Sequence, residues 1–164
     1  IDVAISGFTI TPERAKIVNF TEPYYDAGLG ALIDNKYKDQ IKSLADLEGQ
    51  TICAQIGTSG AMFAQKIKGA QVTQFNTAAE SFMELNKGSC AAAVNDKPVL
   101  EYYLATTKNP NLSLLSDRFT FEQYGIVTAK DNEELTEKIS EGLKTIKANG
   151  TYDKIYQKWF GKQE

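Results

Sequence analysis

Short apolar runs alternate along the chain with longer segments whose apolar residues recur every three or four positions. The short runs are typical of strands buried in a sheet, whereas the three-to-four spacing predicts amphipathic helices. Strands are expected at residues 1–6, 27–33, 51–57, 71–76, 90–96 and 123–129. Because helical patterns separate most of these runs, we predict an α/β fold with largely parallel sheets.

Helix boundaries are marked by residues that favour a first or last turn. Thr11 before Pro12 predicts a helix start, and Thr77 with Glu80 forms a capping box. Further helices are expected at 44–49, 58–69, 97–107 and 152–160. The clearest helical pattern ends at Asn149–Gly150. Its apolar face comprises Leu135, Ile139, Leu143 and Ile146.

Composition places the chain among globular proteins. It has 164 residues, enough for one domain or two small lobes, of which 42% are hydrophobic and 24% charged. The net charge is −3 with both signs interspersed, which gives no indication of nucleic-acid binding. No apolar run approaches the roughly 20 residues of a membrane span.

The residue inventory argues against catalysis. The chain contains no histidine, which removes histidine-based acid–base chemistry and histidine-ligated metals. We find no nucleophile with a base, no carboxylate pair at motif spacing and no metal-binding cluster, so we expect neither an enzyme nor a cofactor. Cys53 and Cys90 lie in apolar runs, and we expect two buried thiols; a disulfide between strands is the alternative in an oxidising compartment.

Three strand-to-helix turns carry groups suited to a charged small molecule. The first, residues 6–14, combines a hydroxyl, exposed backbone groups and Arg14, one of two arginines in the chain. A guanidinium can bind a carboxylate through two parallel hydrogen bonds, which lysine cannot do. The alternative is a surface arginine paired with Glu13, Glu22 or solvent.

The second turn, residues 56–60, offers a helix N-terminus to an anion but lacks the sequence of a phosphate-binding P-loop. The third, residues 94–98, places Asp96 at a strand end, where it could hold an ammonium group. The alternatives are a plain glycine turn and an N-cap aspartate. Together the turns offer partners for both charges of an α-amino acid.

The segment DVAISGFTITPERAKIVNFTEPYYDAGLGALI resembles the signature of extracellular amino-acid-binding proteins that serve ABC transporters. The resemblance continues through SLADLEGQTICAQIGTSG, FMELNKGSCAAAVNDKP, EQYGIVTAKDNEEL and ANGTYDKIYQKWFGK. It points to the polar amino-acid class, similar to glutamine-binding and lysine/arginine/ornithine-binding proteins. This implies a two-lobed periplasmic-binding-protein fold of type II, which closes on its ligand like a Venus flytrap.

The resemblance also implies a domain arrangement. Residues 27–123 would form a complete lobe 2, and residues 1–26 and 124–164 part of lobe 1. The family's opening segment is expected to be missing, because Ile1 already reads as the middle of a sheet; another chain or a swapped copy could supply it. Hinge residues would be Tyr25, Gly28, Gln123, Tyr124 and Gly125.

By the same resemblance, Arg14 and Thr9 would bind the ligand α-carboxylate, joined from lobe 2 by Thr58 and Ser59. Asp96 and the Gly7 carbonyl would take the α-ammonium group, and Ser6 would line the floor. The ligand side chain would be read by two neutral amides, Gln55 and Asn95. Neutral amides favour glutamine or an arginine-like ligand over an acidic one.

The resemblance therefore implies a protein that binds a free polar L-amino acid between two lobes and delivers it to an ABC-transporter permease. It would act outside the cytoplasm, in the periplasm or lipid-anchored at the cell surface. The alternatives are a ligand-sensing module of a receptor, an engineered sensor fragment of the same fold, and a dehydratase-like enzyme, which would need a general acid in the cleft.

Overall fold

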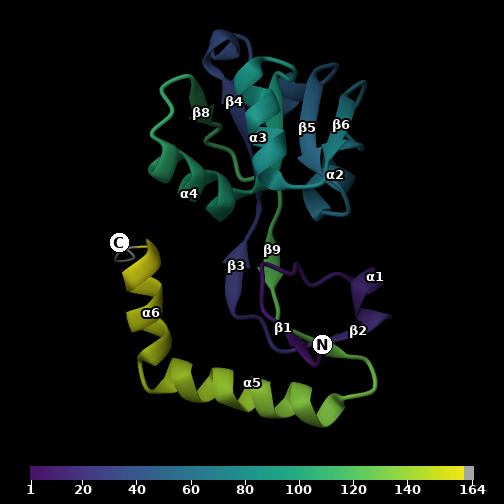
Figure 1. Cartoon of the computed structure of the whole chain (residues 1–164), viewed down its shortest axis with the longest axis vertical. Helices are drawn as coiled ribbons and strands as arrows, with labels where there is room; N and C mark the ends of the chain where they lie inside the picture. Colours follow the sequence, from purple (N-terminus) through teal and green to yellow (C-terminus); the bar gives the residue numbers. More distant parts are fainter. Residues whose placement is uncertain (161–164) are drawn as a thin grey trace. The chain divides into compact units, whose positions relative to one another are not determined.

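The computed structural model describes residues 1–160. Its strands are β1 (Val3–Ala4), β2 (Val18–Phe20), β3 (Tyr25–Ala27), β4 (Leu29–Asp34), β5 (Thr51–Gln55), β6 (Gln71–Phe75), β7 (Ala92–Asp96), β8 (Leu112–Leu114), β9 (Glu122–Tyr124) and β10 (Val127–Ala129). The helices are α1 (Pro12–Ala15), α2 (Ser59–Ala64), α3 (Ala78–Lys87), α4 (Lys97–Thr107), α5 (Glu133–Ala148) and α6 (Thr151–Phe160), with 3₁₀ turns η1 (Asn35–Tyr37) and η2 (Leu44–Leu47) (Figure 1).

The chain divides into two compact units. Unit 1 comprises Ile1–Asp26 and Gln123–Glu164, and unit 2 comprises Ala27–Glu122. The division lies within one residue of the predicted lobe boundaries. That unit 1 is part of a larger lobe stays a prediction, and the last residues of the resemblance, 161 and 162, lie outside the described residues.

Unit 2 is built on a five-stranded sheet in the order β6-β5-β7-β4-β8 (Figure 1). Successive strand residues serve opposite faces: Ile52 packs in one apolar cluster with Leu47 and Ala64, and Cys53 packs in another with Leu85. Because both faces are covered, β4, β5 and β7 read as largely continuous apolar runs, whereas the edge strand β6 is mostly polar and exposed.

The expectation of largely parallel sheets is wrong. In unit 2, β5 runs parallel to β6 and β7, but β4 is antiparallel to β7 and β8. Parallel neighbours need a long crossover, which α2 provides between β5 and β6, and α2 and α3 with β6 provide between β5 and β7. The sheet of unit 1, in the order β1-β10-β2, is antiparallel throughout.

Several other expected elements differ in the structure. The strand expected at 1–6 is only β1, and the helix expected at 44–49 is the 3₁₀ turn η2. The predicted strand 123–129 is split into β9 and β10, because the Gly125 N–H donates to the Phe8 carbonyl (3.0 Å) where the chain changes partners. The predicted helix 58–69 ends as α2 at Ala64, and the chain continues through tight turns in which Ile67 N–H donates to the Ala64 carbonyl. The capping box of Thr77 and Glu80 is present at α3.

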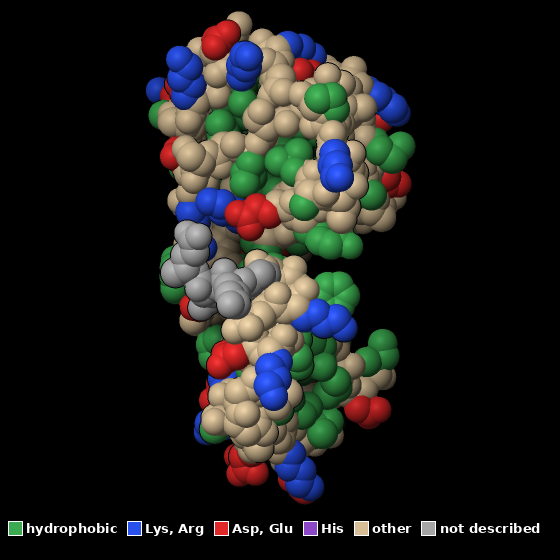
Figure 2. All heavy atoms as spheres, turned by 90° about the vertical axis from the view of Figure 1, so that its left-hand side faces the viewer, with side chains coloured by type: hydrophobic (Ala, Val, Ile, Leu, Met, Phe, Trp, Pro, Cys, Tyr) green, Lys and Arg blue, Asp and Glu red, His purple; other side chains and the backbone are tan. Residues whose placement is uncertain are grey.

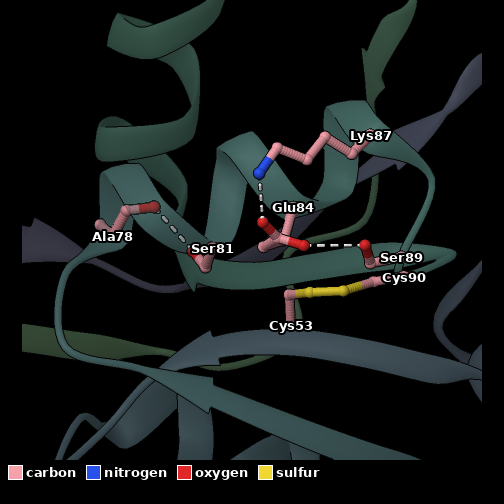
Figure 3. Close-up of a disulfide and its surroundings, with 7 residues drawn as sticks. All are labelled: Cys53, Ala78, Ser81, Glu84, Lys87, Ser89 and Cys90. Atoms are coloured by element: carbon pink, nitrogen blue, oxygen red, sulfur yellow. Dashed lines mark hydrogen bonds and ion pairs between the residues drawn. A yellow bond between two sulfur atoms is a disulfide. The ribbon is translucent and has the colours of Figure 1, made fainter.

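Cys53 and Cys90 form a disulfide, so the expectation of two free thiols is wrong (Figure 3). Cys53 lies on β5 and Cys90 precedes β7, the neighbouring parallel strand, and their Cα atoms are 5.9 Å apart. Both residues are buried beside α3. The apolar runs predicted the burial correctly, but the pairing depends on strand order, which the local sequence does not encode.

Among the described residues, no helix is both long and apolar enough to cross a membrane.

Candidate functional site

In unit 1, the structure brings Thr9 and Arg14 together. The segment Phe8–Ile10 pairs with the chain around β9, since Thr9 forms an antiparallel bridge with Tyr124 and the Ile10 N–H donates to the Gln123 carbonyl (2.9 Å). The Arg14 Nη1 donates to the Thr9 carbonyl at 3.0 Å. This bond occupies one of the five guanidinium donors and fixes the direction of the side chain.

Helix α1 sets the backbone from which Arg14 projects. The Thr11 hydroxyl accepts from the Arg14 backbone N–H (3.2 Å), and Pro12 occupies the first turn, as predicted. The helix has four residues, so Arg14 belongs to its first and last turns alike. In so short a helix, the dipole has little net effect on the Arg14 guanidinium.

Ser6 and Gly7 form an exposed turn just before this pairing. Gly7 has φ +47°, a left-handed conformation that favours glycine, and a Cβ there would lie 3.6 Å from the Tyr124 ring. Burial raises the pKa of the Tyr24 phenol, and a hydrogen bond with the Gly7 backbone opposes part of that shift. The turn is thus held against the tyrosines of unit 1.

In unit 2, the two predicted turns meet at one edge of the sheet. Strands β5 and β7 are adjacent and parallel, so their carboxyl ends share that edge, as expected for ligand sites in α/β sheets. A Cβ on Gly60 would lie 3.3 Å from the Val94 carbonyl oxygen and 3.5 Å from the Asn95 Cα. Helix α2 therefore begins directly against the end of β7.

Several predicted ligand groups at this edge make local hydrogen bonds. The Thr58 hydroxyl donates to the Gln55 carbonyl (2.7 Å) and accepts from the Ala61 N–H (3.1 Å), which caps α2. The Gln55 side chain donates to the Asn76 carbonyl (3.3 Å). These bonds define the local geometry, and the ligand roles of Thr58 and Gln55 stay predictions.

Asn95 and Asp96 complete the edge. Asn95 is buried, and its Oδ1 accepts from the Asp96 backbone N–H at 2.7 Å. Asp96 is the N-cap residue of α4, but its side chain makes no capping hydrogen bond. The alternative reading of Asp96 as an N-cap residue is therefore confirmed for its position, although its side chain does not cap the helix.

Sequence reasoning missed Glu122 at this edge. Its Oε2 accepts from the Ser59 hydroxyl at 2.8 Å, and its Oε1 accepts from the Thr120 hydroxyl at 3.0 Å. The Thr120 hydroxyl in turn accepts from the Leu29 N–H (3.0 Å). A glutamate at the start of a strand has no local sequence signal that would predict such contacts.

The predicted hinge residues lie on or beside two paired strands, β3 and β9 (Figure 1). Gly28 allows a close approach, since a Cβ there would lie 2.3 Å from the Thr120 carbonyl oxygen. The rings of Tyr25 and Tyr124 stack at 5.7 Å, and Gln123 donates to Asp26 (2.8 Å). Gly125 has the Phe20 ring 2.9 Å from an added Cβ. Whether these residues act as a hinge stays a prediction.

Charges of both signs are distributed over the surface, and the described residues offer no metal site. On the face drawn in Figure 2, acidic and basic side chains are interspersed. Among residues 1–160, no group of histidine, cysteine, aspartate or glutamate could hold a metal ion.

Comparison with known proteins finds a family match over nearly the whole chain. The model of bacterial extracellular solute-binding proteins, family 3, matches residues 1–162. The ABC transporter arginine-binding protein 1 of Escherichia coli (strain K12) is 36% identical over 97% of this chain and 66% of its own length. The ABC transporter glutamine-binding protein GlnH of Bacillus subtilis (strain 168) is 37% identical over 97% of this chain and 58% of its own.

A solved structure gives the same result. The structure of an ancestral arginine-binding protein bound to glutamine is 42% identical, with a TM-score of 0.92 over 99% of this chain and 72% of that one. The likeness confirms the predicted type of α/β fold. The chain spans less than two thirds of the length of the two curated relatives.

The family consists of solute-binding proteins rather than enzymes, which confirms the expectation of no catalysis at the level of the family. The family is described as extracellular, in agreement with the expected location outside the cytoplasm. From its match over residues 1–162 and its identity to these relatives, the chain belongs to the bacterial extracellular solute-binding proteins of family 3.

Proposed function

We propose that this chain binds a free polar L-amino acid, of the arginine or glutamine type, and serves an ABC-transporter permease. The arrangement of Arg14 carries the proposal: its guanidinium is fixed on the Thr9 carbonyl beside the exposed Ser6–Gly7 turn. A guanidinium held in this way suits the α-carboxylate of an amino acid. Relatives named for binding arginine and glutamine support the ligand class.

Unit 2 would supply the partner of the second ligand charge. Asp96 would take the α-ammonium group, with the Gly7 carbonyl from unit 1, while Ser59 would add a donor to the carboxylate. A ligand that contacts both units favours a closed state by its differential affinity for that state. Charge-assisted hydrogen bonds of this kind contribute roughly 1.5–3 kcal/mol each.

The setting of the protein follows from the family and the disulfide. The buried disulfide between Cys53 and Cys90 supports an oxidising compartment, because such bonds are rare in the cytosol. Within the extracellular assignment of the family, we infer a location in the periplasm or, through a lipid anchor, at the cell surface.

A thermal-shift screen of the purified protein tests the proposal. The twenty amino acids, ornithine and citrulline would each be added at several concentrations. Arginine or glutamine should raise the melting temperature progressively with concentration, because a ligand that binds the native state stabilises it by mass action. Aspartate and glutamate serve as matched negative controls. A protein that responds to none of these compounds would contradict the proposal.

A further inference from the structure

Glu122 holds the hydroxyl of a residue that the proposed function assigns to the ligand. Ser59 is the first residue of α2 and follows the N-cap Thr58. Its hydroxyl donates to Glu122 Oε2 at 2.8 Å, and Thr120 donates to the other carboxylate oxygen at 3.0 Å. Both bonds lie within unit 2, and neither donor is a cation.

The Ser59 hydroxyl has one proton to donate. While this proton is shared with Glu122, the hydroxyl cannot also donate to a ligand carboxylate. A carboxylate is the stronger acceptor, since hydrogen bonds to an ionised group are about twice as strong as neutral ones. The ligand carboxylate must therefore displace Glu122, which is also a carboxylate, as the acceptor of the Ser59 hydroxyl.

We propose that Glu122 is an affinity-determining residue that competes with the α-carboxylate of the amino-acid ligand for the Ser59 hydroxyl. The inference rests on the proposed function, because it takes Ser59 as a ligand group. In the unliganded protein, Glu122 satisfies the hydroxyl. On binding, the hydroxyl rotates from Glu122 to the ligand, and Glu122 keeps its bond from Thr120.

The competition has an electrostatic part as well. Glu122 places a negative charge beside a group expected to meet a carboxylate, and like charges repel at short range. Replacing Glu122 by glutamine removes the charge and weakens the acceptor, yet keeps the side-chain length and an oxygen for Thr120. The unusual consequence is that Glu122→Gln should tighten binding, whereas loss of a direct ligand contact would weaken it.

A double-mutant cycle with calorimetry tests the inference, using L-arginine and L-glutamine as probes. Wild type, Glu122→Gln, Ser59→Ala and the double variant would be compared. Ser59→Ala leaves the Thr58 cap of α2 in place. Glu48→Gln is the matched charge control, since Glu48 is exposed and precedes β5, at the opposite end of that strand from Ser59.

We expect Glu122→Gln to tighten binding of both probes by about three- to tenfold, or roughly 0.7–1.4 kcal/mol, because the ligand then displaces a weaker acceptor. The gain should be clearly smaller in the Ser59→Ala background, where only the electrostatic part remains, and absent in Glu48→Gln. Thermal unfolding of each variant would establish that it is folded.

Weaker or unchanged binding by folded Glu122→Gln would overturn the inference, and so would an equal gain in the Ser59→Ala background. Wild-type protein that binds neither probe would instead contradict the proposed function itself. If Glu122→Gln does not fold, Ser59→Ala alone completes the test. Because the ligand would only replace Glu122 as the acceptor of the Ser59 hydroxyl, removing that hydroxyl should weaken binding by less than about threefold. A loss of about tenfold or more would overturn the inference.

Discussion

The interiors of the two units are built from different chemistry. Unit 2 contains two clusters of buried aliphatic and aromatic side chains, one on each face of its sheet. Among the described residues of unit 1, the buried hydrophobic ones are Tyr124, Ile126 and Leu143, and the buried polar ones are Thr9, Thr21 and Thr128.

The threonines of unit 1 replace apolar packing with hydrogen bonds. Thr21 accepts from the Ile126 N–H (3.1 Å) and donates to the Glu22 carbonyl (2.8 Å), and Thr128 shares a hydrogen bond with Thr136 (2.6 Å). Such bonds contribute about 0.5–1.5 kcal/mol each and are directional. Burial of aliphatic area thus dominates in unit 2, whereas unit 1 combines ring contacts such as Tyr25 with Tyr124 and buried threonine hydrogen bonds.

The largest expected effect is loss of the disulfide in unit 2. Cys53 and Cys90 are 37 residues apart. Removing both by Cys53→Ala with Cys90→Ala should lower the free energy of unfolding by about 4 kcal/mol, from the entropy of closing a loop of that length. Denaturant unfolding followed by circular dichroism measures the change. Equal unfolding midpoints for the variant and the oxidised wild type would contradict this prediction. As a control, added reductant should not change the unfolding midpoint of the variant.

A second comparison concerns the cost in stability of truncating one aliphatic residue on a helix of each unit. Leu85 on α3 is 0% exposed, whereas Ile155 on α6 is 51% exposed. Leu85→Ala should cost about 3 kcal/mol through lost burial and a cavity, and Ile155→Ala less than about 1 kcal/mol. Urea titrations of both variants test this, and similar losses would mean that α6 is packed more fully than the structure indicates.

The smallest expected effects come from two threonine helix caps. Thr77→Ala removes the capping box of α3 and should cost unit 2 about 1 kcal/mol without changing ligand affinity.

Thr11→Ala removes the acceptor for the Arg14 backbone N–H in unit 1. It should lower affinity for L-arginine severalfold with little change in stability. Thermal unfolding and calorimetry on both variants would separate these outcomes; the reverse pattern would argue against the contrast between the units.

The difference between the units also explains how much the sequence could predict. The apolar runs of β5 and β7 and the caps Thr11 and Thr77 are local signals, and the structure confirms them. The direction of β4 and the pairing of Cys53 with Cys90 depend on which strands are neighbours. Periodicity does not specify that order, so both expectations were wrong.

The candidate site shows the same limit. Arg14 stood out as one of two arginines, and its guanidinium contacts the Thr9 carbonyl, whereas the ligand role of both residues stays a prediction. Glu122 escaped notice because its partners, Ser59 and Thr120, come from a distant helix start and a loop. Residue type and local spacing identify charged groups that need partners, but the fold decides which partners they receive.

The central claim is that Arg14 and Asp96 bind the two charges of one amino acid. Calorimetry with L-arginine and L-glutamine on wild type, Arg14→Lys and Asp96→Asn tests it most directly, with agmatine as an arginine analogue that lacks the α-carboxylate. We predict that each substitution weakens amino-acid binding at least about tenfold, or roughly 1.4 kcal/mol, and that Arg14→Lys leaves any agmatine binding unchanged. Unchanged amino-acid affinity in both folded variants would contradict the account.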